Sequence, residues 1–136
     1  MKKRILIVDD EVGFTHLLRL SLETVGSYEV REENDSRRAV AAALEFEPDL
    51  VVLDIMMPQL DGSEVASRFK ADPVLRDVPV LFLTALVSLD EAPSGTCDSG
   101  GQSFLPKDLP IDKLIECIEA KIKASGTPKP WVAAHS

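Results

Sequence analysis

The feature that most constrains the fold is a set of short apolar runs that stop abruptly at acidic residues. Residues 5–8 read Ile-Leu-Ile-Val and end at Asp9 and Asp10, and residues 50–53 read Leu-Val-Val-Leu and end at Asp54. A continuous apolar run of this length is typical of a strand that is covered on both faces. The two runs therefore predict buried strands of a parallel sheet.

The other predicted elements alternate between strands and helices along the chain. Such alternation implies a doubly wound α/β domain whose connections are right-handed crossovers. We expect a five-stranded parallel sheet in the flavodoxin-like order 2-1-3-4-5. The remaining strands are expected at residues 79–84, 103–105 and, at a sheet edge, 28–33, and apolar spacing predicts helices that include residues 14–25, 39–44, 65–69 and 111–122.

One interval breaks this alternation. Residues 86–102, where the fourth of five helices belongs, contain Pro93 and several Gly and Ser residues, a composition that favours turns. We expect that helix to be shortened or replaced by a loop. The length of 136 residues suggests one domain, which we place at residues 1–125, followed by a flexible C-terminal tail at residues 126–136.

Composition bounds the expected partners and location. The chain has 15 Lys+Arg against 23 Asp+Glu, a net charge of −8, and no basic run extends beyond residues 2–4. We therefore expect no direct nucleic acid partner. The apolar runs are too short for a membrane span or a signal peptide, so a cytoplasmic protein without membrane insertion is expected. Cys97 and Cys117 fit no metal-binding or Cys-x-x-Cys spacing and are interpreted as reduced thiols.

Polar side chains at the strand ends carry the functional signal. The carboxyl ends of parallel strands meet at one edge of the sheet, which predicts that Asp9, Asp10, Asp54, Thr84 and Lys107 converge there. Two carboxylates about 4 Å apart repel by on the order of 4 kcal/mol at an effective dielectric constant near 20. Three grouped acids therefore call for a cation, and Mg²⁺ prefers oxygen ligands of this kind.

Such a group of residues suits phosphoryl transfer. An ionised aspartate beside Mg²⁺ can attack a phosphoryl group, while a lysine ammonium neutralises its oxygens and a threonine hydroxyl donates to one of them. Taken singly, each residue has a simpler interpretation: Asp9 or Asp10 as a helix N-cap, Asp54 as a turn residue, Thr84 as an ordinary strand residue, Lys107 as a surface charge. The five in order at strand ends favour the functional interpretation.

The chain resembles a known family at these residues. The segments are Ile-Leu-Ile-Val-Asp-Asp-Glu at 5–11, Leu-Asp-Ile-Met-Met-Pro-Gln-Leu-Asp-Gly at 53–62, Leu-Thr-Ala at 83–85, and Lys107. Together they look like the receiver domain of two-component response regulators, of the chemotaxis-regulator type. The resemblance covers about residues 3–124.

The resemblance implies a role for each site residue. Asp54 would be the phosphoacceptor, and Mg²⁺ would be held by Asp10, Asp54 and the backbone carbonyl of Met56, with Asp9 acting through metal-bound water. Thr84 and Lys107 would contact the phosphoryl oxygens. Thr84 and Phe104 would also form the switch that reshapes the output surface, although ordinary packing explains Phe104 equally well.

Two departures from the family pattern stand out. The family usually follows its lysine with a cis proline, whereas Asp108 follows Lys107 here and Pro106 precedes it. The interval 86–102 is the second departure, and we interpret it as an altered output surface in preference to a tolerated loop replacement.

The main hypothesis is a phosphorylation-dependent signalling switch, not an enzyme beyond self-catalysed phosphorylation and dephosphorylation. It would accept a phosphoryl group from a histidine kinase or a histidine phosphotransfer domain, as a monomer or weak homodimer, and act through an unknown downstream protein, as a relay or a terminal switch. One alternative is a receiver-like adaptor that is not phosphorylated. A phosphohydrolase with an aspartate nucleophile is a weaker alternative, because Met56 stands where its second acid belongs.

Overall fold

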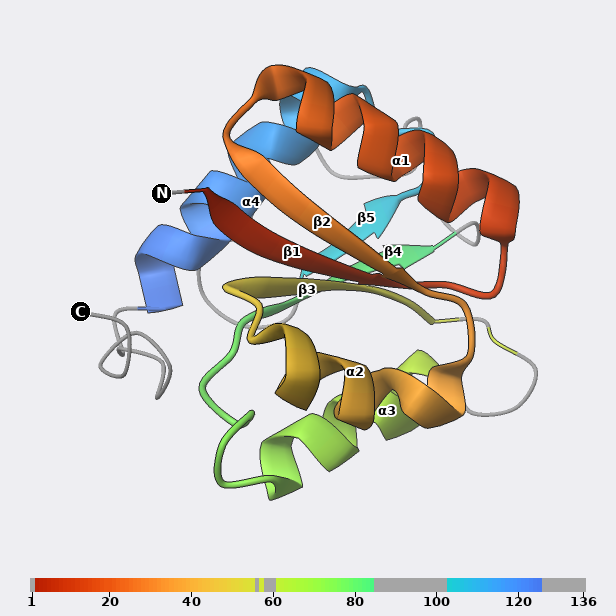
Figure 1. The fold of residues 1–136 in the computed structure, drawn as a ribbon, viewed down its shortest axis with the longest axis vertical. Helices are drawn as coiled ribbons and strands as arrows, with labels where there is room; N and C mark the ends of the chain where they lie inside the picture. The colour runs from red at the N-terminus through yellow and green to blue at the C-terminus, as the bar shows by residue number, and fades with distance from the viewer. Residues whose placement is uncertain (1, 56, 58–60, 85–102, 126–136) are drawn as a thin grey trace.

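The fold is built on a parallel sheet of five strands (Figure 1). The computed structural model describes residues 2–55, 57, 61–84 and 103–125, without the side chains of residues 103, 104 and 125. The sheet order is β2-β1-β3-β4-β5, which confirms the predicted fold and the edge position of residues 28–33. The strands are β1 (Lys3–Val8), β2 (Tyr28–Glu33), β3 (Leu50–Asp54), β4 (Val80–Thr84) and β5 (Ser103–Pro106).

Helices cover both faces of this sheet. Figure 1 shows α1 and α4 on one face and α2 and α3 on the other. The interval predicted to lack a full helix, residues 86–102, lies outside the described residues, as does the predicted tail at 126–136. The helices are α1 (Val12–Val25), α2 (Ala39–Phe46), α3 (Gly62–Ala71) and α4 (Ile111–Ser125), and the short 3-10 helix η1 (Ser36–Arg38) precedes α2.

Two hydrophobic clusters explain why the strand runs are apolar throughout. Successive side chains of a strand point to opposite faces of the sheet. In β1, Ile5 and Ile7 pack with the α1 and α4 cluster, whereas Leu6 and Val8 pack with the α2 and α3 cluster. Each central strand therefore buries both of its faces. This burial fixes the register of the strand, and with it the position of its last residue relative to the neighbouring strands.

Local signals set the helix boundaries. Gly26 ends α1 with φ +90, a conformation that glycine adopts without the strain of a side chain. Asp61 begins α3, and its Oδ1 accepts a hydrogen bond of 2.9 Å from the backbone N–H of Glu64. Asp35 accepts from the N–H of Arg37, so the polar stretch before α2 caps η1 rather than α2 itself.

Cys117 corrects one expectation from sequence. It lies on the buried face of α4 and is disulfide-bonded, so its interpretation as a reduced thiol is wrong. Spacing along the chain carried no information on this, because disulfide formation depends on distance in space. Within the described residues, no helix is both long enough and apolar enough to cross a membrane.

Candidate functional site

The carboxyl ends of four strands meet at one edge of the sheet. Asp9 and Asp10 follow β1, Asp54 and Thr84 are the last residues of β3 and β4, and Lys107 follows β5. The register aligns these ends, since Val8 pairs with Leu53, Asp54 with Leu83, and Thr84 with Pro106. The structure therefore brings the acids and Lys107 together and places Thr84 at the end of the neighbouring strand.

The three aspartates form a compact acidic group. Carboxylate oxygens of Asp9, Asp10 and Asp54 all lie within 4.8 Å of one another. Asp9 and Asp54 are buried, whereas Asp10 is exposed. Oxygen ligands at this spacing, with one side open to solvent, fit a hard divalent cation such as Mg²⁺, which binds one or two carboxylates and keeps several waters.

Lys107 is the counter-charge of this group. Its Nζ lies 2.8 Å from Asp9 Oδ2, 2.5 Å from Glu11 Oε1 and 3.4 Å from Asp54 Oδ2. Burial lowers the pKa of the Lys107 ammonium, but the hydrogen bonds to Asp9 and Glu11 and the charges of Asp9 and Asp54 outweigh burial and raise the pKa above its usual value. Lys107 therefore remains protonated at neutral pH.

At Asp9, burial outweighs the effect of the charged partner. Burial raises the pKa of its carboxyl to about 6, and the charge of Asp54 adds to this, although bonds from Lys107 and from the backbone of Glu11 oppose the shift. Asp9 Oδ1 accepts the Glu11 N–H at 3.0 Å. The N-cap of α1 is Glu11, without a side-chain capping bond, so the simpler interpretation of Asp9 or Asp10 as that cap is wrong.

The turn after β1 is braced from β2. Asn34 Nδ2 donates to the carbonyl of Asp9 at 2.9 Å and to Thr15 Oγ1 at 2.9 Å, and Thr15 Oγ1 donates to Glu32 Oε1 at 2.9 Å. Thr15 is fully buried, so this network holds the acidic turn against α1. No pattern in the sequence indicates this contact, which spans 25 residues.

Gly62 positions the backbone of Asp54. Its N–H donates to the carbonyl of Ile55 at 2.9 Å, and a Cβ at this position would come within 2.4 Å of the Asp54 carbonyl oxygen. Atoms cannot approach this closely, so only glycine permits the contact. The signal in the sequence is the Asp-Gly pair at 61–62, since glycine is the residue that permits such a close approach.

The remaining predicted site residues are placed only in part. Thr84 is buried, and its carbonyl accepts the N–H of Lys107 at 3.2 Å. The backbone of Phe104 pairs with Phe82 in the sheet, but its side chain lies outside the described residues, as does the whole of Met56. The described residues contain no cis peptide bond, and Pro106 is the last residue of β5.

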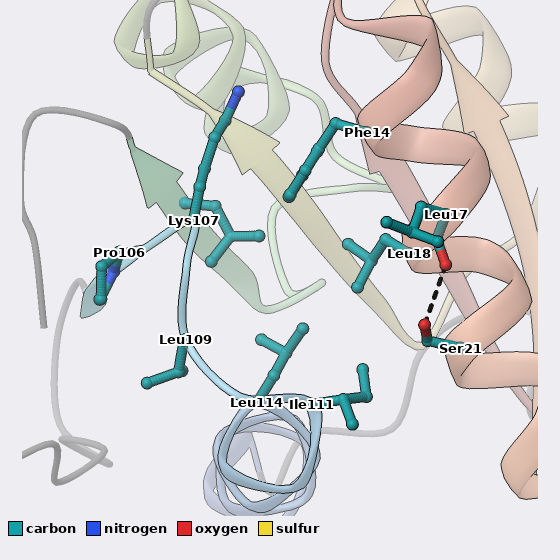
Figure 2. Close-up of a pocket in the computed structure, with 10 residues that line it drawn as sticks. Phe14, Leu17, Leu18, Ser21, Pro106, Lys107, Leu109, Ile111 and Leu114 are labelled. Atoms are coloured by element: carbon teal, nitrogen blue, oxygen red, sulfur yellow. Dashed lines mark hydrogen bonds between the residues drawn. The ribbon is translucent and has the colours of Figure 1, made fainter.

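An apolar hollow of about 150 Å³ adjoins this edge of the sheet (Figure 2). Figure 2 shows Lys107 leaving the loop after β5 beside Phe14 of α1, and the Lys107 Nζ lies 4.8 Å from the centroid of the Phe14 ring. Exposed Leu17 and Ile111 stand on its α1 and α4 sides. Lys107 thus belongs both to the acidic group and to the wall of the hollow.

Known proteins match this chain over most of its length. A family model described as the response regulator receiver domain matches residues 5–119. The DNA-binding dual master transcriptional regulator RpaA of Synechocystis is 35% identical over 98% of this chain and 54% of its own length. The response regulator MprA of Mycobacterium tuberculosis is 37% identical over 100% of this chain and 56% of its own.

A solved structure agrees with these relatives. The chemotaxis protein CheY4 of Vibrio cholerae superposes with a TM-score of 0.72 at 25% identity, covering 88% of this chain and 98% of that one. The chain thus spans about half the length of the curated relatives named above.

The relatives overturn the expectation about partners. RpaA is named as DNA-binding, so the prediction of no nucleic acid partner and of output through an unknown protein alone is wrong. The net charge of −8 is that of a chain that matches about half of that relative. It carries no information on contacts that the other half of the relative makes.

Proposed function

This chain belongs to the family of response regulator receiver domains, and we propose that it is a phosphorylation-dependent switch in which Asp54 accepts a phosphoryl group. The donor is a histidine kinase or a histidine phosphotransfer protein. The observation that supports this proposal most directly is the buried Asp54 carboxylate, with the Lys107 ammonium 3.4 Å away and two further acids within 4.8 Å.

The transfer itself needs one nucleophile. An oxygen of Asp54 forms a bond to phosphorus as the bond from phosphorus to the donor imidazole nitrogen breaks, and the electron pair of that bond leaves with the nitrogen. The product is an aspartyl phosphate. Lys107 donates to one phosphoryl oxygen and the Thr84 hydroxyl to another, which spreads the negative charge that develops there.

The acidic group fits Mg²⁺ as judged from its own donor set. Asp10, Asp54 and the backbone carbonyl of Met56 would hold the ion, and Asp9 would act through a bound water. The chemistry that Mg²⁺ supplies is neutralisation of the phosphoryl charge during transfer. Without a cation, Asp9, Asp10, Asp54 and Glu11 face the single charge of Lys107.

The output follows from the same residues. Thr84 moves toward the phosphoryl group, and Phe104 responds on β5, so that the surface around these strands differs between the two states. From the name of the RpaA relative alone, we propose that the final output is control of transcription. The receiver spans residues 1–125, and the protein acts in the cytoplasm without enzymatic turnover of other substrates.

The hollow beside Lys107 supports a protein as the donor. It lies next to the acidic group, is lined mainly by apolar side chains, and carries exposed Leu17 of α1 and Ile111 of α4 at its sides. A partner protein that buries these side chains would bring its phosphoimidazole to Asp54. A small phosphate ester is too small to cover them.

The test is the intact mass of the protein after incubation with acetyl phosphate and Mg²⁺. Wild type is expected to gain one phosphoryl group, and Asp54→Ala and the chelated sample none. Asp77→Ala, which removes an exposed aspartate between α3 and β4, is the matched control and should behave as wild type. If wild type gains nothing from acetyl phosphate or from a kinase, the adaptor alternative replaces this proposal.

A further inference from the structure

Carboxylates hold the ammonium of Lys107 in place. An ammonium carries three N–H groups, and three carboxylates surround Nζ: Glu11 at 2.5 Å, Asp9 at 2.8 Å and Asp54 at 3.4 Å. The ring of Phe14 lies against the same Nζ, with its centroid at 4.8 Å. In the unphosphorylated protein, Nζ thus donates hydrogen bonds to Glu11 and Asp54 and forms an ion pair with Asp9.

Phosphorylation changes the partners of Lys107. Its Nζ now lies closer to Glu11, at 2.5 Å, than to Asp54, at 3.4 Å. To donate to phosphoryl oxygens on Asp54, as the proposed function requires, the ammonium must turn away from Glu11. The side chains of Asp9 and Asp54 are 2% and 3% exposed, whereas that of Glu11 is 62% exposed. A buried carboxylate that loses its cation pays a large desolvation cost, but an exposed one is rehydrated.

We propose that Glu11 is a positioning residue that holds Lys107 in the unphosphorylated state and is displaced when the phosphoryl group arrives. This inference rests on the proposed function and adds a competitor to it. Glu11 and the phosphoryl oxygens compete for the ammonium of Lys107. Glu11 therefore weakens the binding of a phosphoryl group and slows phosphorylation.

The expected effect is moderate because Glu11 is mostly exposed. Ion pairs with an exposed partner are generally weak, and their loss changes an equilibrium by up to about fivefold. Glu11→Gln keeps the length of the side chain and removes its charge. We expect this variant to bind a phosphoryl mimic about threefold to fivefold more tightly than wild type.

The experiment titrates beryllofluoride into the protein at a fixed Mg²⁺ concentration and follows backbone amides by NMR. Glu64→Gln is the matched control, because it removes the same charge. Glu64 is exposed in the first turn of α3 and has no ion pair with Lys107 among the described contacts. Its affinity should equal that of wild type. Backbone amide spectra taken before the titration establish that each variant is folded.

A second background separates positioning from simple charge removal. In Lys107→Gln, beryllofluoride binds more weakly, and a further Glu11→Gln change should add nothing, because Glu11 then has no lysine to hold. If Glu11 acted only by repelling the anion, the gain would persist in this background. A double-mutant cycle with zero coupling therefore overturns the proposal.

A spectroscopic measurement without Mg²⁺ or beryllofluoride tests the contact itself. The ¹⁵Nζ resonance of Lys107 in the resting protein should shift in Glu11→Gln and stay unchanged in Glu64→Gln. Wild-type affinity for beryllofluoride in Glu11→Gln would overturn this inference while leaving the proposed function intact. Failure of wild type to bind beryllofluoride would overturn both.

Discussion

Two lysine clusters lie at opposite ends of β1, and their charges differ. At the start of the strand, Lys3 forms an ion pair with Glu119 of α4, and the Tyr28 hydroxyl donates to Glu119 Oε2 at 2.5 Å. At the other end, Lys107 contacts Asp9, Glu11 and Asp54. Both clusters join the sheet to residues distant in sequence.

The charge balance of each cluster indicates what it needs. The Lys3 cluster has one cation and one carboxylate, both 42% exposed, so it is neutral without a ligand. The Lys107 cluster sets one cation against Asp9, Asp10, Asp54 and Glu11. Structure-stabilising ion pairs tend toward neutrality, whereas an unbalanced and buried group requires a further cation. The comparison thus separates a structural pair from a ligand site.

Exchange of each lysine for glutamine tests this comparison with the largest expected effect. Lys107→Gln should slow phosphorylation by acetyl phosphate on the order of 100-fold, because the variant loses the charge that stabilises the transferring phosphoryl group. Lys3→Gln should leave the rate within twofold of wild type and cost less than about 1 kcal/mol of unfolding free energy. Intact-mass time courses and urea denaturation measure the two quantities.

Equal losses of phosphorylation rate in the two variants would show that both lysines act through stability. The far-UV circular dichroism of each variant is the control, since a rate is interpreted only for a folded protein. A Lys107→Gln variant that is phosphorylated at the wild-type rate would remove Lys107 from the proposed mechanism.

Magnesium should stabilise only the unbalanced cluster. At a Mg²⁺ concentration about 100 times the dissociation constant, linkage raises the unfolding free energy of wild type by roughly 2.7 kcal/mol. Asp10→Asn should lose most of this gain at the same concentration, because it removes one carboxylate from the acidic group. Glu119→Gln, at the other end of β1, should keep it in full.

Thermal melts with Mg²⁺ and with a chelator measure the difference directly. Calcium-free buffers keep the comparison to one ion. If the Mg²⁺-dependent gain in stability survives in Asp10→Asn but vanishes in Glu119→Gln, the cation binds near Glu119 and not at the acidic group.

The sequence predicted the unbalanced cluster better than the balanced one. Asp9, Asp10, Asp54, Thr84 and Lys107 follow from one rule, since the ends of parallel strands share an edge. Nothing comparable predicts that Lys3 meets Glu119, because the two residues lie 116 positions apart and neither ends a strand.

Contacts within the site show the same limit. The Glu11 contact to Lys107 spans 96 residues, and the brace from Asn34 to the Asp9 carbonyl depends on how the end of β2 packs against α1. Apolar periodicity determines which face of an element is buried, but it does not determine where a long side chain of a neighbouring element ends. The fold and the strand-end residues were therefore predictable, but the contacts of Glu11 with Lys107 and of Asn34 with Asp9 were not.

The smallest predicted effect is a pH dependence of opposite sign at the two ends of β1. In the absence of Mg²⁺, burial raises the pKa of Asp9 to about 6, so between about pH 4 and pH 6 the folded protein holds a proton that the unfolded chain releases. The contribution of Asp9 to the unfolding free energy is therefore present at low pH and is lost as pH rises through this window. We expect a loss of about 2 kcal/mol, because water that enters with the ionised carboxylate offsets part of the burial cost.

Glu119 has the reverse sign. Burial raises the pKa of its carboxyl, but hydrogen bonds from Lys3 and Tyr28 and the charge of Lys3 outweigh burial, so the pKa lies below its usual value near 4.5. Its contribution is present above that pH and is lost as pH falls. Urea denaturation in chelator between about pH 3 and pH 7, followed by circular dichroism, should show a smaller loss of stability with rising pH in Asp9→Asn. Glu119→Gln should instead show a smaller loss of unfolding free energy as pH falls at the acidic end. A pH profile that neither substitution alters would mean that both clusters carry the same charge in the folded and unfolded states.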